Sequence, residues 1–257
     1  MNRAHSGHDV DFLIGEWQRL CAKANWKRQL LVDVSGWPIE AIEIPGQGGG
    51  AGLPDYISSG VHGDECAPIW ALLDWARDLA DGQSTLDRPI TVVPCLNPWG
   101  IANNSRGDES GIDLNRHFQD ETHPVIGPWR RYLGGRDFGL ALNLHEDFDG
   151  RGIYLYEIWR DQSIGEFLLN QCERIIAREP DGMVDGRPAE GGLLAADEAE
   201  IRDVVEEELE GGTPEAIYLF LEHAQRSLTF ETPSEHDLEV RIAAHRRFIN
   251  AALACGR

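Results

Sequence analysis

Residues 56–80, YISSGVHGDECAPIWALLDWARDLA, contain the two kinds of secondary structure that decide the fold. The first six residues, 56–61, form a short and mostly apolar run, which is typical of a buried strand. After the polar turn HGDE, apolar residues recur at helical spacing over residues 66–80. This stretch therefore predicts a strand, a polar turn and a helix in direct succession.

The same alternation of strands and helices continues along the rest of the chain. The expected strands are residues 29–35, 39–44, 56–61, 89–96, 138–144, 152–156, 217–221 and 227–230, and the expected helices are residues 10–25, 66–80, 164–178 and 238–253. Because the strands are almost continuously apolar, they are typical of a mainly parallel (mixed) central sheet buried on both faces. We therefore expect a single α/β/α domain over residues 1–257, with ligands bound where strands end.

The composition is that of a folded, acidic protein. Of 257 residues, 42% are hydrophobic, and 23 Lys and Arg stand against 44 Asp and Glu, giving a formal net charge of −21. This charge excludes nucleic acid and anionic membrane surfaces as partners, because both attract Lys and Arg. Residues 190–210 are especially acidic, and we expect an amphipathic helix with a solvated face there. An acidic lid near a site is the alternative.

Two further features favour a cytoplasmic location. The N-terminal residues contain no apolar stretch of the signal-peptide kind, and no run of about 18 apolar residues is present that could span a membrane. The five cysteines are scattered and form no CxxC pair, so we expect free thiols in a reducing compartment. The sequence does not predict an oligomeric state.

Three residues at expected strand ends have the chemistry of a metal site. His62 and Glu65 form an HxxE element directly after one strand, and His145 follows another in LALNLHED. Two imidazoles and one carboxylate, with a fourth position left open, are the catalytic zinc pattern. The alternative for HxxE alone is an exposed histidine beside a helix-capping glutamate. We expect the histidines near or on the later helices, such as His245, to be solvated.

Glu231 and two arginines add the other groups that a hydrolase needs. Glu231 follows an apolar strand in TFETPS and could accept a proton from an activated water. Arg106 and Arg116 lie in the polar segment 97–118, and guanidinium groups bind carboxylates and stabilise oxyanions. Each residue also has a purely structural alternative. Glu231 would mark the exit of a strand, and the arginines would pair with nearby acidic residues.

The order of the motifs HGDE, NPxG, DLNRxF, LHED and TFETPS resembles that of the zinc carboxypeptidase superfamily, family M14. This superfamily includes a compact branch related to succinylglutamate desuccinylase and aspartoacylase, and the resemblance covers most of the chain. It implies the zinc carboxypeptidase-like fold, with His62, Glu65 and His145 as the Zn²⁺ ligands. It also implies that Asp113 orients the first zinc histidine, since metal-bound imidazoles usually donate their second N–H to an acceptor.

The resemblance implies roles for four other residues. Glu231 would be the general acid and base, and Arg106 would polarise the scissile carbonyl and support the oxyanion. Asn115 and Arg116 would grip the terminal carboxylate of the substrate.

The residue that covers the substrate is less clear. The digestive carboxypeptidases have a mobile tyrosine that closes over the substrate, and Tyr218 precedes Glu231 by 13 positions. Tyr154 and Tyr156 are alternatives, although aromatic packing within a strand also explains them.

These features predict a zinc-dependent metallopeptidase or amidohydrolase that cleaves a peptide or amide bond next to a free carboxylate. The expected partner is a small peptide. An N-acyl amino acid deacylase, acting on an N-acyl amino acid, is the alternative enzyme. A non-catalytic zinc-binding homologue is a third possibility, but the joint presence of three ligands, Glu231 and Arg106 argues against it.

Overall fold

An eight-stranded mixed sheet forms the centre of the protein, with the strand order β1-β2-β4-β3-β5-β10-β6-β9. The computed structural model describes residues 7–48, 52–184, 186–207 and 212–255. The strands of this sheet are β1 (Lys27–Val34), β2 (Trp37–Ile44), β3 (Asp55–Ser59), β4 (Ile90–Val93), β5 (Ala141–Asp147), β6 (Tyr154–Trp159), β9 (Leu193–Asp197) and β10 (Arg226–Pro233). A separate hairpin consists of β7 (Gly182–Val184) and β8 (Arg187–Ala189).

The middle of the sheet is parallel. β3 pairs in parallel with both β4 and β5, and β5 pairs in parallel with β10. The pairs β1–β2, β2–β4 and β10–β6 are antiparallel, whereas β9 runs parallel to β6. The expected mainly parallel, mixed sheet is confirmed. Its consequence is that the carboxyl ends of β3, β5 and β10 lie at the same edge.

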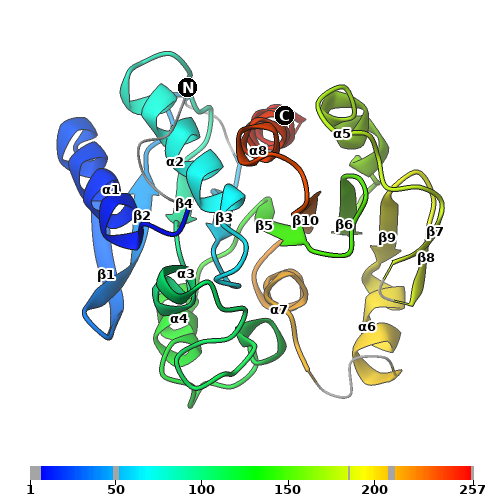
Figure 1. Ribbon diagram of the computed structural model, residues 1–257, viewed down its shortest axis with the longest axis horizontal. Coiled ribbons are helices and arrows are strands. Elements are labelled where there is room, and N and C mark those ends of the chain that lie inside the picture. The colour runs from blue at the N-terminus through cyan, green and yellow to red at the C-terminus, as the bar shows by residue number, and fades with distance from the viewer. Residues whose placement is uncertain (1–6, 49–51, 185, 208–211, 256–257) are drawn as a thin grey trace.

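Helices cover both faces of the sheet, as Figure 1 shows. One layer contains α1 (Val10–Ala24), α2 (Ala67–Ala80), α5 (Gly165–Cys172) and α8 (Leu238–Cys255). The other contains α3 (Pro98–Asn103), α4 (Ile126–Leu133), α6 (Glu198–Glu207) and α7 (Glu215–Glu222), together with the single 3₁₀ turn η1 (Leu114–Arg116). The expected α/β/α architecture is confirmed.

Each face of the sheet has its own apolar core. On the α8 side, the rings of Phe230 and Phe248 are stacked with centroids 4.3 Å apart, and both side chains are fully buried. On the opposite side, Tyr56 of β3 contacts Trp129 of α4 edge to face. Burial of side chains of this size stabilises a fold by about 1.5–3 kcal/mol each. The two cores hold the sheet edge that carries the polar residues in a fixed position.

The predicted strand at residues 217–221 is wrong, because these residues belong to helix α7. The sequence EAIYLFLE is apolar in its middle without a period of two, and periodicity alone cannot separate such a run from a buried strand. α7 packs against β5 and β10, so most of its residues are buried and the polar face of an ordinary amphipathic helix is missing.

Other element boundaries also differ from expectation. The helix expected at 164–178 ends at Cys172. β5 and β10 extend to Asp147 and Pro233 because their parallel pairing continues through that register. His145 and Glu231 therefore lie within strands rather than after them.

The acidic segment 190–210 divides into two elements, β9 and α6. In α6, Ile201 is buried and Glu200 is exposed, as expected of an amphipathic helix, and residues 208–210 lie outside the described residues. Among the described helices, none is both long and apolar enough to cross a membrane. The five cysteines are free thiols.

Candidate metal centre

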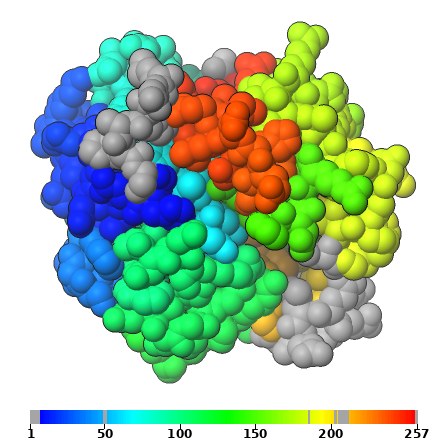
Figure 2. Space-filling view, viewed as in Figure 1, coloured from blue at the N-terminus to red at the C-terminus, as the bar shows by residue number. Residues whose placement is uncertain are grey.

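The candidate metal centre lies at the carboxyl edge of the parallel strands. β3 ends at Ser59 and leads directly into the turn that carries His62, while Leu144 of β5 pairs with Ser59. His145 is the next residue of β5, and its ring centroid lies 5.1 Å from that of His62. In the space-filling view, the cyan part of the chain that follows β3 lies in a hollow between green and orange segments (Figure 2).

The turn that carries His62 is held by close backbone contact. The N–H of Gly63 donates to the Ser105 carbonyl at 2.9 Å. A Cβ atom at Gly63 would lie 1.9 Å from the carbonyl carbon of Gly100, so no larger residue fits without moving α3. The start of α3 therefore fixes the position of the first histidine.

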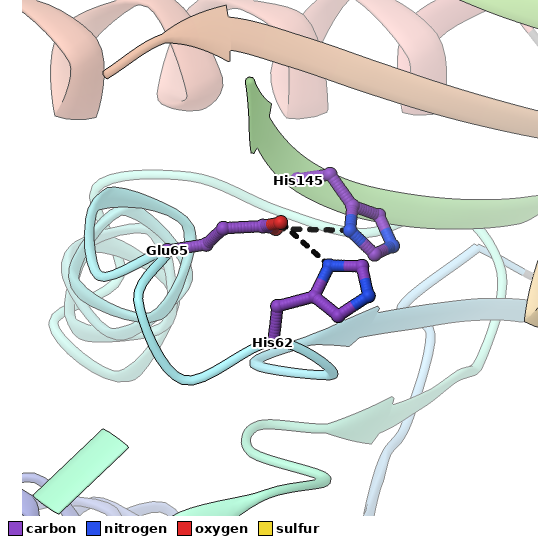
Figure 3. A group of neighbouring side chains, drawn as sticks. All are labelled: His62, Glu65 and His145. Carbon is purple, nitrogen blue, oxygen red and sulfur yellow. Dashed lines mark hydrogen bonds and ion pairs between the residues drawn. The ribbon is translucent and has the colours of Figure 1, made fainter. Parts of the chain in front are cut away.

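Glu65 lies between the two histidines, as Figure 3 shows. Its Oε1 is 2.5 Å from Nδ1 of His62, and its Oε2 is 2.9 Å from Nδ1 of His145. The donor atoms of the three residues all lie within 4.8 Å of one another, and all three residues are buried. The structure thus brings together the three residues that the sequence suggested as metal ligands.

The three residues perturb one another's ionisation. Burial disfavours the imidazolium of His62, but Glu65 and Asp113 outweigh it and raise the pKa of His62 to about 9. Burial likewise opposes ionisation of Glu65, yet the two histidines hold the pKa of its carboxyl well below its usual range. Without a metal, the cluster is held together by protons shared between the histidines and Glu65. A metal ion would have to displace these protons.

The donor set fits a zinc ion. Both histidines turn Nδ1 toward Glu65, while Nε2 of His62 faces Oδ1 of Asp113 at 3.0 Å. A carboxylate behind a histidine fixes the ring and its tautomer, which is the usual arrangement around metal-bound imidazoles. Two imidazole nitrogens and a carboxylate oxygen are the ligands of many catalytic zinc sites.

Arg106 lies beside this cluster. Its Nε donates to Oδ2 of Asp113 at 3.2 Å, and its Nη1 is 3.6 Å from Oε1 of Glu65. Its side chain remains 49% exposed, so the guanidinium is also accessible from the solvent.

Glu231 lies on the neighbouring strand. It pairs in register with His145 on one side and with Tyr154 on the other, and it is 9% exposed. Adjacent strands are about 4.8 Å apart, which places Glu231 next to the metal cluster. Burial and then the charge of Glu231 raise the pKa of Tyr154.

Asn115 and Arg116 follow Asp113 directly in η1. Oδ1 of Asn115 accepts a hydrogen bond from the N–H of Glu215 at 2.9 Å, which joins η1 to the start of α7. Arg116 is exposed, and its Nη1 donates to the carbonyl of Asn115 at 3.0 Å. Within the described part of the chain, its guanidinium forms no ion pair with a carboxylate.

A cavity of about 500 Å³ opens beside Arg116. Tyr156 and Thr229 also line it, and Thr229 lies two residues before Glu231 on the same face of β10. Much of the remaining lining is apolar and includes Ile158, Leu194, Ala196, Ile201, Val204 and Ile217. The cavity is therefore a mainly apolar space that begins about 7 Å from Glu231 along the strand.

The cavity separates the three candidate tyrosines. Tyr156 lines it, whereas the hydroxyl of Tyr154 donates to Asp147 at 2.9 Å. Tyr218 is buried in α7 against Trp129, with ring centroids 5.5 Å apart. Tyr156 is thus the tyrosine of the three that lines the cavity.

The sequence analysis missed several buried polar residues behind the cluster. Glu146 was quoted only as part of LHED, yet its side chain is fully buried and contacts Arg241. His245 was expected in solvent, but it is fully buried because it shares the inner face of α8 with Phe248. Glu215 is also fully buried. Their spacing gives no signal beyond a polar residue among apolar ones.

Comparison with known proteins gives a consistent result. A Shewanella amazonensis protein, a candidate metallopeptidase, is 25% identical, with a TM-score of 0.79 over 95% of this chain and 92% of that one. A metallo-carboxypeptidase from Burkholderia cenocepacia is 15% identical, with a TM-score of 0.66 over 93% of this chain and 67% of that one. The fold and the donor cluster thus define a metallocarboxypeptidase-like protein.

The sequence comparisons narrow this class. Residues 52–129 match the succinylglutamate desuccinylase/aspartoacylase catalytic domain. Carboxypeptidase SOL1 of Arabidopsis thaliana is 29% identical over 127 residues, which are 45% of this chain and 26% of that protein. The chain therefore spans about a quarter of this curated relative. The expected resemblance to the M14 superfamily and its compact desuccinylase- and aspartoacylase-related branch is confirmed.

Glu215 predicts a pH dependence of stability. Its oxygens accept hydrogen bonds from the hydroxyls of Tyr56 (2.8 Å) and Ser58 (2.9 Å), and burial raises its pKa from 4.5 to about 7 against the effect of these bonds. Because the folded-state pKa is the higher one, protonation stabilises the fold at low pH. This contribution is lost as the pH rises from about 4.5 to about 7.

We expect Glu215→Gln to become more stable relative to the wild-type protein across that window, by about 1.4 kcal/mol per pH unit. Urea unfolding at a series of pH values measures the difference. Stability curves that run parallel between pH 4.5 and 7 would contradict the assignment.

Proposed function

We propose that this protein is a zinc-dependent hydrolase that cleaves a peptide or amide bond next to a free carboxylate. The observation that carries the proposal is the buried His62, Glu65 and His145 cluster with Glu231 on the adjoining strand. We further infer that residues 1–257 form one catalytic domain, which the continuous sheet supports. A cytoplasmic location is proposed from the five free cysteines.

His62, Glu65 and His145 would hold the metal, and Asp113 would orient His62 through Nε2. A zinc ion bound there would supply Lewis-acid polarisation of the scissile carbonyl and activation of a water molecule. The acidity of Glu65 and the hydrogen bond from Asp113 keep these donors in place before the metal arrives.

The protein's own groups would then complete the reaction. Glu231 would accept the proton of the attacking water and deliver it to the leaving nitrogen. Arg106, half exposed beside Glu65, would stabilise the negative charge that develops on the carbonyl oxygen. Both residues lie beside the metal cluster, so neither needs a large movement to act.

Substrate binding would depend on Arg116 and Asn115. The exposed guanidinium of Arg116 at the mouth of the cavity is suited to bind a carboxylate in a bidentate manner. The group attached to that carboxylate would enter the cavity, where Tyr156 and the apolar lining favour a large apolar group. The substrate would therefore be a small peptide whose last residue is apolar.

An N-acyl amino acid deacylase is the second candidate. The observation that favours it is the match of residues 52–129 to the succinylglutamate desuccinylase/aspartoacylase catalytic domain. The same metal site would then act on an acyl-amide, and the amino acid part would still need a site for its carboxylate.

A substrate panel separates the two candidates. We expect the zinc-loaded protein to hydrolyse di- and tripeptides with a C-terminal apolar residue faster than N-acyl amino acids with the same residue. Release of the free amino acid measures both reactions on one scale. If the peptides are inert while an N-acyl amino acid is cleaved, the deacylase is the correct assignment.

Replacement of Glu231 tests the proposed mechanism. We expect Glu231→Gln to lower kcat/KM by about 10²–10⁴-fold, the range for loss of a general acid–base group. Zinc affinity should remain unchanged, because Glu231 is not among the proposed ligands. Glu235→Gln, an exposed glutamate just beyond the same strand, is the matched control. Full activity of Glu231→Gln would exclude this mechanism.

Filling the cavity tests the proposed selectivity. Ala196 lines the cavity, whereas Ala195 is exposed and points to the other face of β9. We expect Ala196→Phe to lower kcat/KM by about 10–100-fold for substrates ending in a large apolar residue and to spare those ending in alanine. Ala195→Phe should leave both unchanged. A uniform loss for all substrates would show that the cavity does not receive the side chain.

A further inference from the structure

We infer that Glu146 is a positioning residue that holds the metal ligands Glu65 and His145 in place through a buried network with Arg241. This inference rests on the proposed metal-dependent function. It concerns a residue that touches neither substrate nor metal in that proposal and acts through its neighbours. Three sets of contacts support it.

The first contact is made by the main chain of Glu146. Its N–H donates to Oε2 of Glu65 at 3.0 Å, and the same oxygen faces Nδ1 of His145 at 2.9 Å. Glu146 directly follows His145 in β5. A shift of Glu146 would therefore move one ligand and break the hydrogen bond to the other.

The second contact joins Glu146 to helix α2. Its Oε2 accepts a hydrogen bond from the N–H of Ala67 at 2.8 Å. Ala67 is the first residue of α2, and the side chain of the N-cap residue Cys66 makes no capping hydrogen bond. The carboxylate of Glu146 thus supplies the cap and the negative charge that a helix N-terminus favours. Glu65, two residues before Ala67, is therefore held from both sides.

The third set of contacts joins Glu146 to α8 and β10. Oε1 accepts hydrogen bonds from the guanidinium of Arg241 and from the hydroxyl of Thr232, the latter at 3.3 Å. Thr232 follows Glu231, and its hydroxyl also lies 3.0 Å from Nε2 of His245. The side chain of Glu146 is 0% exposed and that of Arg241 is 12% exposed. One buried carboxylate thereby links four of the elements that surround the metal centre.

The chain contains a second network of the same chemistry away from the metal centre. Glu157 is fully buried, pairs with Arg226 at 2.5 Å and accepts hydrogen bonds from the N–H groups of Ile164 and Gly165 at the start of α5. It makes no hydrogen bond or ion pair to His62, Glu65 or His145 among the described residues. Its side chain also points away from the face that Tyr156 and Ile158 present to the cavity. Glu157 is therefore a matched control for Glu146.

The experiment measures Zn²⁺ affinity by competition with a chromogenic chelator, together with the thermal midpoint of the metal-free protein. We expect Glu146→Gln to bind Zn²⁺ about 10–100-fold more weakly than the wild-type protein, the usual effect of losing an outer partner of a metal ligand. Glu157→Gln should lower the thermal midpoint but keep the wild-type affinity. A merely structural role of Glu146 would not separate the two variants.

Arg241→Gln provides a second test if Glu146→Gln does not fold. It leaves the carboxylate and the cap of α2 intact, so we expect a smaller loss of Zn²⁺ affinity, about threefold to tenfold. Wild-type affinity in a folded Glu146→Gln, in Arg241→Gln when Glu146→Gln does not fold, or equal losses in Glu146→Gln and Glu157→Gln, would overturn the inference alone. Failure of the wild-type protein to bind Zn²⁺ would overturn the proposed function as well.

Discussion

The buried carboxylate of Glu65 is the group on which the arrangement of the site depends. An isolated carboxylate is costly to bury, by several kcal/mol even after relaxation, unless positive charges and hydrogen-bond donors surround it. Here the side chains of His62 and His145 and the N–H of Glu146 meet its two oxygens, and Arg106 lies nearby. The parallel strands β3 and β5 make this possible, because they end side by side. The cluster that satisfies the carboxylate is also a set of three metal donors.

The overall charge of the chain places a demand on substrate capture. A net charge of −21 repels a substrate that carries a carboxylate, although salt screens this repulsion beyond about 8–10 Å. Arg106 contributes little long-range attraction because Asp113 and Glu65 lie against its guanidinium. In the proposed function, attraction must come from Arg116 and from the metal itself. The apolar cavity would then provide selectivity rather than charge.

Much of the fold and the site could be predicted because they depend on local patterns. Apolar strands followed by polar residues gave the sheet edge, and His62, Glu65 and His145 meet there. The identity of α7 could not be predicted, since burial on nearly all sides removes the helical pattern from its sequence. The partners of Glu146 were equally hidden. Arg241 lies 95 positions away, and nothing in the spacing of α8 shows that its Arg241 and His245 turn inward.

The central claim is that His62, Glu65 and His145 bind one zinc ion through the atoms that now face one another. The most direct measurement is the anomalous diffraction of crystals grown with zinc, recorded at the zinc absorption edge. The account predicts a single strong peak at about 2.0–2.2 Å from Nδ1 of both histidines and from an oxygen of Glu65. No peak at this position, or coordination through Nε2 of His62 in place of its contact with Asp113, would contradict the account.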